Sequence, residues 1–219
     1  MSTYLRRRGR LTSAQARALE SHGPATIVPA DQDAPVDLPA LYGRDAPVGL
    51  EIGFGSGQAL LDWAEAAPDW NLIGVEVYEP GIGALLKGMH ERGLANIRII
   101  ARDAQEVVGQ LIPTGSLAEV RIFFPDPWPK KRHHKRRLIQ APFVSQLADR
   151  MCPGALLRMA TDWQPYAEQM LEVLQAETAF ENAAGEGFSE RFEARNVTRF
   201  EARGQRLGHG VWDLCYRRR

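Results

Sequence analysis

From Pro47 onward, short apolar runs alternate with segments whose apolar residues recur at helical spacing. The runs predict strands, and the segments between them predict helices. The expected strands are 48–52, 71–77, 96–101, 119–124 and 155–160, and the expected helices are 58–66, 81–92, 105–111, 135–151 and 163–175. Strands that alternate with helices of this length form βαβ units, so the pattern predicts one α/β domain with a mostly parallel sheet and helices on both faces.

The two ends of the chain lack this alternation. Residues 1–46 hold a basic stretch and then a lead-in rich in Pro, Ala and Asp. We expect a basic arm and irregular structure there, with the domain itself spanning 47–219. The first 19 residues hold five arginines and no acid, so an organelle transit peptide is the alternative interpretation. In the tail, residues 190–195 and 211–216 predict a C-terminal antiparallel strand pair joined by a long loop.

Composition places the chain among globular proteins, since 44% of its 219 residues are hydrophobic and 25% are charged. No apolar run approaches the roughly 18 residues that a membrane-spanning helix needs, so no membrane association is expected. The only cysteines, Cys152 and Cys215, are far apart, which argues against a disulfide framework and a cysteine zinc site. These features predict a cytoplasmic protein.

The net charge of zero conceals a segregation of charge. Segments 1–19, 128–137 and 217–219 hold about half of the basic residues and no acidic one, which leaves the rest of the chain strongly acidic. Concentrated basic patches on an acidic body suit a polyanion that touches the protein in defined places. A solvated surface is the alternative interpretation of each single patch.

The first expected strand runs into a glycine-rich turn, Glu51-Ile52-Gly53-Phe54-Gly55-Ser56-Gly57. Glycines at Gly53, Gly55 and Gly57 allow a tight turn and the close approach of a ligand. Glu76 follows the second strand at the distance expected of a carboxylate that binds ribose hydroxyls, and Asp103 follows the third strand, where it can accept from an adenine amino group. A nicotinamide enzyme is the alternative, but Glu51 would repel a pyrophosphate and suits the cationic groups of S-adenosylmethionine.

The fourth strand ends in Pro125-Asp126-Pro127-Trp128-Pro129, and a basic run follows from Lys130 to Arg137. Three prolines in five residues make this segment a stiff loop at the carboxyl end of a strand, where ligands of open α/β sheets bind. Asp126 is therefore a carboxylate fixed beside the expected cofactor. The adjacent His133 and His134 point different ways and have no third ligand nearby in the sequence, so no metal is expected.

These motifs resemble those of a known family. The glycine loop resembles motif I of the class I, Rossmann-like methyltransferases, and the segment from Pro125 to Arg137 resembles the signature of bacterial tRNA (guanine-N7-)-methyltransferases. Two more stretches, 160–163 (Ala-Thr-Asp-Trp) and 198–210, resemble the same family. The resemblance covers about residues 50–216, and Pro129 departs from it, since other members tend to have a polar residue there.

The resemblance implies transfer of a methyl group from S-adenosylmethionine to N7 of a guanosine in the variable loop of tRNA, in the cytoplasm. It implies that Asp126 is the active-site acid and contacts the cofactor together with Glu51, Glu76 and Asp103. The substrate guanosine would be bound by Lys130, Asp162, Thr198, Arg199, Phe200 and Glu201. The RNA backbone would be held by Arg132, His133, His134, Lys135, Arg136 and Arg137. Monomer and homodimer both stay open.

The chemistry is consistent with these residues. Guanine N7 carries a free lone pair at neutral pH, so alignment and electrostatics suffice and no general base is needed. Asp126 or Asp162 can accept from the guanine imino and amino groups, and Trp128 or Trp163 can stack on an exposed base. Two further alternatives stay open at this point: an RNA-binding protein that keeps an inactive methyltransferase fold, and a methyltransferase that acts on a small molecule or a protein.

Overall fold

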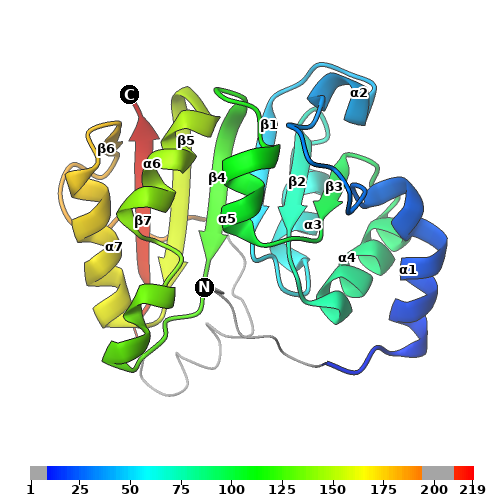
Figure 1. Cartoon of the computed structure of the whole chain (residues 1–219), viewed down its shortest axis with the longest axis horizontal. Coiled ribbons are helices and arrows are strands. Elements are labelled where there is room, and N and C mark those ends of the chain that lie inside the picture. The colour runs from blue at the N-terminus through cyan, green and yellow to red at the C-terminus, as the bar shows by residue number, and fades with distance from the viewer. Residues whose placement is uncertain (1–8, 194–209) are drawn as a thin grey trace. The chain divides into compact units, whose positions relative to one another are not determined.

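The computed structural model describes residues 9–193 and 210–219. The described elements belong to two compact units, one within Arg6–Pro113 and the other within Thr114–Arg219. Each unit is built around its own set of strands, and each contains part of the predicted site (Figure 1).

The first unit carries three parallel strands in the order β3-β2-β1. Its elements in chain order are α1 (Ser13–Thr26), α2 (Leu38–Tyr42), β1 (Val48–Ile52), α3 (Gln58–Ala66), β2 (Asn71–Val75), α4 (Glu79–Arg92), β3 (Ile97–Ile100), α5 (Ala104–Glu106) and a π-helical turn (Val107–Leu111). Helices α1, α3 and α4 share one buried cluster with Leu72, Ile97 and Ile99 of the strands. Strand β1 and helix α3 have the predicted bounds.

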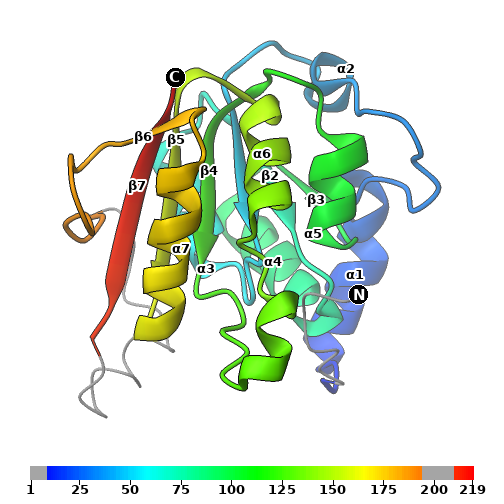
Figure 2. The ribbon, with the colours of Figure 1, turned by 60° about the vertical axis from the view of Figure 1, so that its left-hand side comes forward.

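The second unit carries four strands in the order β4-β5-β7-β6. Its elements are β4 (Leu117–Phe123), a 3₁₀ helix η2 (Lys131–Arg136), α6 (Ala141–Arg150), β5 (Met151–Thr161), α7 (Gln164–Ala176), β6 (Phe180–Asn182) and β7 (Trp212–Arg218). Strands β4 and β5 are parallel, whereas β7 is antiparallel to both β5 and β6. Helices α6 and α7 pack on one face of these strands (Figure 2).

The expectation of irregular structure before residue 47 is wrong for α1 and α2. Thr12 caps α1 through a reciprocal pair of hydrogen bonds with Gln15, and α1 packs along α4 (Figure 1). The Gln15 amide also donates to the Pro80 carbonyl at the start of α4 (3.1 Å). Tertiary packing therefore stabilises a helix that has little hydrophobic periodicity of its own and contains Pro24. The domain boundary at residue 47 stays a prediction.

Two other predictions need correction. The helix expected over 135–151 is two elements, because the chain turns extended at Arg137 and α6 begins at Ala141, with Pro142 in the first turn where proline is favoured. The strand expected over 190–195 does not form in its described part, 190–193, and β6 is the strand that pairs with β7. The antiparallel pair itself is confirmed, with a different first member. Among the described residues, no helix has the length and apolar character needed to cross a membrane.

Candidate active site

The glycine loop of the first unit leaves room for a ligand. Gly53, Gly55 and Gly57 have φ of 73°, 57° and 81°, values that residues other than glycine rarely adopt. A Cβ added at Gly53 or Gly55 would meet no atom within 4 Å, so both face open space. The loop is pinned where it leaves β1, because the Gly53 N–H donates to the Val75 carbonyl of β2 (2.8 Å).

Glu76 ties this loop to the segment after β2. Its Oε2 accepts from the Gly55 N–H at 2.9 Å, and its Oε1 accepts from the Val77 and Tyr78 N–H groups at 2.7 and 3.0 Å. A carboxylate has about four lone-pair sites, so the same oxygens retain capacity for hydroxyl donors of a ligand. Glu76 therefore both shapes the glycine loop and fits the predicted role of ribose acceptor.

Glu51 and Asp103 complete an acidic row at the carboxyl ends of three neighbouring strands. Glu51 is paired in register with Gly74 of β2 and is only 3% exposed, which makes it a buried carboxylate beside the open loop. Asp103 follows β3 and caps α5, its Oδ1 accepting from the Gln105 N–H (2.9 Å). A buried carboxylate is stabilised by a cationic partner, and S-adenosylmethionine carries an ammonium and a sulfonium. The first unit thus fits the predicted cofactor.

The loop after β4 in the second unit has a strained backbone. Phe124 and Trp128 have φ of 52° and 43°, which is uncommon for large side chains. They flank Pro125-Asp126-Pro127, and the Phe124 N–H still pairs with the Ala160 carbonyl of β5 (2.8 Å). Strain of this kind clusters at functional sites, where the surrounding structure holds it in place. Asp126 is half-buried at the centre of this loop.

Asp126 and Asp162 emerge from the same edge of the second unit. Phe123 at the end of β4 pairs with Ala160, which lies two residues before Asp162. Because β4 and β5 run parallel, their carboxyl ends coincide and bring both half-buried carboxylates to one edge. Two acceptors at this edge suit a guanine, which presents imino and amino donors.

Trp128 packs against two side chains of the basic 3₁₀ helix η2. It is 6% exposed, the Arg136 guanidinium lies over its ring at 4.9 Å, and the His133 ring meets it edge-on at 5.8 Å. Of the two rings predicted as candidates for stacking on a base, Trp128 is thus the enclosed one, and the half-buried Trp163 at the start of α7 is favoured. The cations that point to solvent are Lys130, Lys131, Arg132 and Lys135.

Arg137 also departs from its predicted role. The residue is 1% exposed, and its guanidinium donates to the carbonyl oxygens of Pro127 (2.8 Å) and Pro165 (3.2 Å) and to Gln169 Oε1 (2.5 Å). It also lies 4.8 Å from the centre of the Tyr166 ring. A side chain enclosed in this way does not reach a phosphate, so Arg137 is not an RNA contact in this structure.

Two pKa shifts follow from this environment. Partial desolvation and the cations Arg132, Arg136, Lys130 and Lys135 lower the pKa of His133, which favours its neutral form at pH 7. Burial raises the pKa of the Tyr166 phenol. Tyr166 therefore stays protonated and accepts from the Ile139 N–H (3.1 Å).

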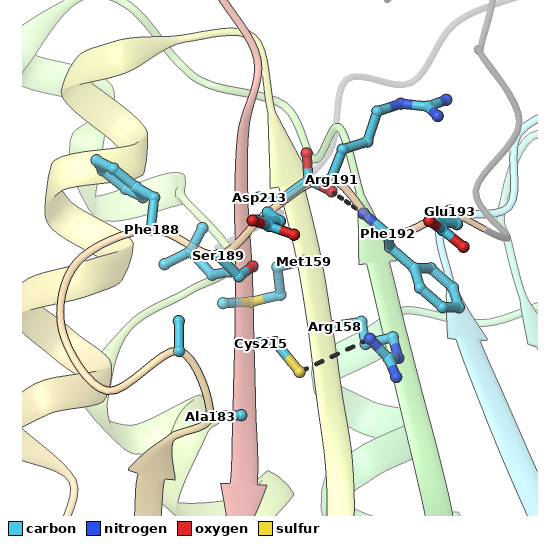
Figure 3. A pocket seen from close by; sticks show the side chains of 13 residues that line it. Arg158, Met159, Ala183, Phe188, Ser189, Arg191, Phe192, Glu193, Asp213 and Cys215 are labelled. Carbon is cyan, nitrogen blue, oxygen red and sulfur yellow. Dashed lines mark hydrogen bonds between the residues drawn. The ribbon is translucent and has the colours of Figure 1, made fainter.

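A pocket that the sequence did not predict lies on β5 and β7 (Figure 3). Its volume is about 730 Å³. The segment that borders it, residues 188–193, is fixed by two hydrogen bonds to Asp213. The Ser189 N–H donates to the Asp213 carbonyl (2.9 Å), and the Phe192 N–H donates to Asp213 Oδ1 (3.5 Å). The Phe192 ring packs 4.0 Å from the Arg158 guanidinium. Prominent among the lining side chains are Arg158, Phe188, Arg191, Phe192, Asp213 and Cys215.

The predicted substrate residues Thr198, Arg199, Phe200 and Glu201 lie outside the described residues. The described chain before them ends at Glu193, beside the pocket. Among the residues that the structure does describe, no group of three or more His, Cys, Asp or Glu side chains has a metal-binding arrangement.

Comparison with known proteins defines the class first. A family model described as a putative methyltransferase matches residues 45–214. The crystal structure of the 16S rRNA methyltransferase KamB superposes with a TM-score of 0.63 at 16% identity, covering 89% of this chain and 99% of that one. An antibiotic-related methyltransferase gives a TM-score of 0.53 at 15% identity, over 87% and 96% of the two chains. The fold is thus that of Rossmann-like methyltransferases, and the chain is an S-adenosylmethionine-dependent methyltransferase.

The curated relatives define the family. Proteins named tRNA (guanine-N(7)-)-methyltransferase from Paracidovorax citrulli and Thiobacillus denitrificans are 53% and 54% identical to this chain. The alignments cover 100% and 99% of this chain and 87% and 95% of the relatives. The chain therefore belongs to the tRNA (guanine-N(7)-)-methyltransferase family, as its motifs predicted, and the nicotinamide alternative is wrong.

Proposed function

We propose that this chain transfers the methyl group of S-adenosylmethionine to N7 of a guanosine in tRNA, and that the target is the variable-loop guanosine. The observation that carries the proposal is the identity of 53–55% over 99–100% of the chain to relatives of that name. A cytoplasmic location is part of this proposal, and the concentrated basic patches of the sequence suit a polyanion such as tRNA.

The first unit would hold the cofactor. Glu76 accepts from the ribose hydroxyls, Asp103 accepts from the adenine amino group, and Glu51 neutralises the cationic end of the cofactor. Gly53 and Gly55 supply the open space for its approach. When bound, S-adenosylmethionine supplies an electrophilic methyl group, and the pair of electrons of the broken C–S bond remains on sulfur.

The second unit would hold the guanosine. Asp126 accepts from the guanine imino and amino groups and stabilises the positive charge that develops on the ring as the N7 lone pair forms the new N–C bond. Asp162, at the same edge, is the second acceptor, and Lys130 contacts the nucleotide from the start of η2. Thr198 to Glu201 complete the substrate site in this proposal. Because N7 carries no proton, alignment of the base is the main contribution of these residues.

The exposed cations of η2 would bind the phosphates of tRNA. Lys131, Arg132 and Lys135 point to solvent from a single short helix, and Arg136 and His133 hold that helix against Trp128. Such contacts position the RNA without reading its sequence. His134 is the remaining polar side chain of the helix that could contact RNA, and its Nε2 lies 3.2 Å from Arg137 Nη2.

The proposal is tested by transfer of tritiated methyl groups from S-adenosylmethionine to bulk tRNA, followed by digestion and nucleoside analysis. We expect the label in 7-methylguanosine. Two control substrates should stay unlabelled: ribosomal RNA, and a tRNA transcript in which the variable-loop guanosine is replaced by adenosine. Label in another nucleoside would contradict the N7 assignment, and label in ribosomal RNA alone would contradict the tRNA assignment. Binding of tRNA without any transfer would favour an RNA-binding protein with an inactive fold.

A further inference from the structure

The loop that carries Asp126 has few backbone N–H groups with which to hold its own conformation. Pro125, Pro127 and Pro129 have no N–H, so the loop has few donors of its own. The left-handed backbone at Phe124 and Trp128 costs about 1–2 kcal/mol for each residue, by the general penalty for this region. Contacts from elsewhere in the chain must therefore maintain the position of Asp126.

One side chain supplies such a contact from within the unit. The Nε of Arg137 donates to the carbonyl of Pro127 at 2.8 Å, and Pro127 is the residue directly after Asp126. Its Nη1 donates to the Pro165 carbonyl (3.2 Å) and to Gln169 Oε1 (2.5 Å), both in α7. Helix α7 begins two residues after Asp162. A single guanidinium thus joins the two segments that carry the carboxylates of the site.

The chemistry of these contacts requires arginine. The acceptors named above are neutral, and the guanidinium is buried at 1% exposure. A planar fork with five donors on three nitrogens reaches acceptors on two sides at once, whereas a lysine ammonium carries its three donors on one compact nitrogen. The Gln169 amide also donates to the Ile139 carbonyl (3.1 Å), which fixes the acceptor that Arg137 uses.

We infer that Arg137 is a positioning residue for methyl transfer, which sets the separation of Asp126 and Asp162 and does not bind RNA. The inference rests on the proposed function, because it concerns the geometry in which the guanine is held. Its mechanical reason is that the Arg137 guanidinium donates both to the loop after β4 and to the first two turns of α7, so these segments cannot shift relative to each other without breaking its bonds. Loss of the fork would leave phosphate binding by η2 intact while misaligning the base.

Arg137→Lys separates this role from phosphate binding, because the substitution keeps the positive charge and removes the fork. We expect kcat for tRNA methylation to fall at least tenfold, with the Kd for tRNA within about twofold of wild type. The slope of log Kd against log salt should not change. The matched control is Lys135→Ala, an exposed neighbour on η2, for which tRNA affinity and the salt slope should both decrease, the slope by about one.

A salt slope reduced by about one in Arg137→Lys, with kcat retained, would overturn the inference and restore Arg137 as a phosphate contact. If the variant does not fold, as judged by thermal melting, Gln169→Ala decides the question, since it removes an anchor and leaves Arg137 in place. A lower kcat at unchanged tRNA affinity supports the inference, and an unchanged kcat overturns it. Wild-type turnover is measured alongside, so absence of tRNA methylation by wild type would refute the proposed function itself.

Discussion

Asp126 is held between two prolines, so the direction of its carboxylate is set largely by the backbone. We expect Asp126→Asn to reduce methyl transfer by at least a hundredfold, because an amide lacks the charge that stabilises the developing cation. The protein should stay folded, since the side chain is half-buried and the loop is tied through backbone carbonyls. Single-turnover transfer with saturating tRNA and cofactor measures the effect.

Asp162→Asn is the matched comparison, because Asp162 lies at the same edge and is likewise half-buried. A loss at position 126 that greatly exceeds the loss at position 162 would make Asp126 the acceptor that orients the guanine. Turnover near wild type in Asp126→Asn would remove Asp126 from the active site.

Glu76 makes three backbone hydrogen bonds in addition to its proposed contact with ribose. In Glu76→Gln the amide nitrogen replaces one acceptor oxygen, so it must face either the Gly55 N–H or the Val77 and Tyr78 N–H groups as a second donor. We expect cofactor binding to weaken by about 1–3 kcal/mol, as for the loss of a charge-assisted hydrogen bond. Calorimetric titration with S-adenosylhomocysteine gives the value, and equal loss of tRNA affinity would contradict the assignment.

His133 predicts a pH dependence of RNA binding. Its pKa is lowered in the free protein by desolvation and by neighbouring cations, whereas a phosphate placed beside it favours the charged ring and raises the pKa. Binding then takes up a proton, so tRNA affinity should increase as pH falls through the pKa of the complex and level off below the pKa of the free protein. Filter binding from pH 8 to pH 5.5 measures this profile. An identical profile in His133→Gln would show that His133 is not near a phosphate.

Helix η2 presents its cations unevenly, and this refines the salt dependence expected of RNA binding. Lys131 and Lys135 are exposed, whereas Arg137 is buried. The double variant Lys131→Ala, Lys135→Ala should reduce the slope of log affinity against log salt by at most about two, and affinity should drop for every tRNA alike.

Arg217→Ala serves as the control for that experiment. Arg217 pairs with Leu156 in the middle of β5, five residues before Thr161, which is about 17 Å along the strand. The arginines at positions 217–219 therefore lie far from the edge that carries Asp126 and Asp162. A slope that changes as much in Arg217→Ala as in the η2 double variant would contradict the assignment of phosphate binding to η2.

Helix α1 depends on its cap, because it has little amphipathic character and packs mainly through its contact with α4. Thr12→Ala removes the side chain that accepts from the Gln15 N–H and leaves an N-terminal donor of the helix without its cap. We expect a loss of about 1 kcal/mol in the free energy of unfolding of the unit that contains α1. Chemical denaturation measures it, with the exposed neighbour Ser13→Ala as the control; equal effects of both changes would argue against the cap.

The alternation of strands and helices can be predicted from the sequence because buried parallel strands are continuous apolar runs. For this reason β1 and α3 were predicted to the residue, and the acidic row of Glu51, Glu76 and Asp103 followed from strand ends. The elements that were missed, α1, α2 and β6, have no such local signal: α1 is stabilised by α4, and β6 exists only by pairing with β7.

The roles within the basic run could not be separated by sequence. Arg136 and Arg137 are adjacent and identical, yet one lies over Trp128 and the other is buried against Tyr166. The two arginines have different environments because the chain turns at Arg137 and because α7 packs beside it. Both features belong to the tertiary structure and have no local signal in the sequence. Likewise, the sequence grouped residues 217–219 with the other basic patches, but the antiparallel course of β7 carries them away from Thr161, since Arg217 pairs with Leu156 in the middle of β5.

The place of β7 between β5 and β6 also sets the order in which the second unit can form. Residues of β7 pair with β5 across fifty or more intervening positions, so a long loop must close before this pairing contributes any stability. Such non-local pairing slows folding relative to the neighbouring helices, whose contacts are local. Strand β6 and the bonds from Ser189 and Phe192 to Asp213 all require β7, and they are expected to appear together in the slowest kinetic phase. The segment that leads to Thr198–Glu201 is thus anchored last, and local unfolding of β7 would release it first.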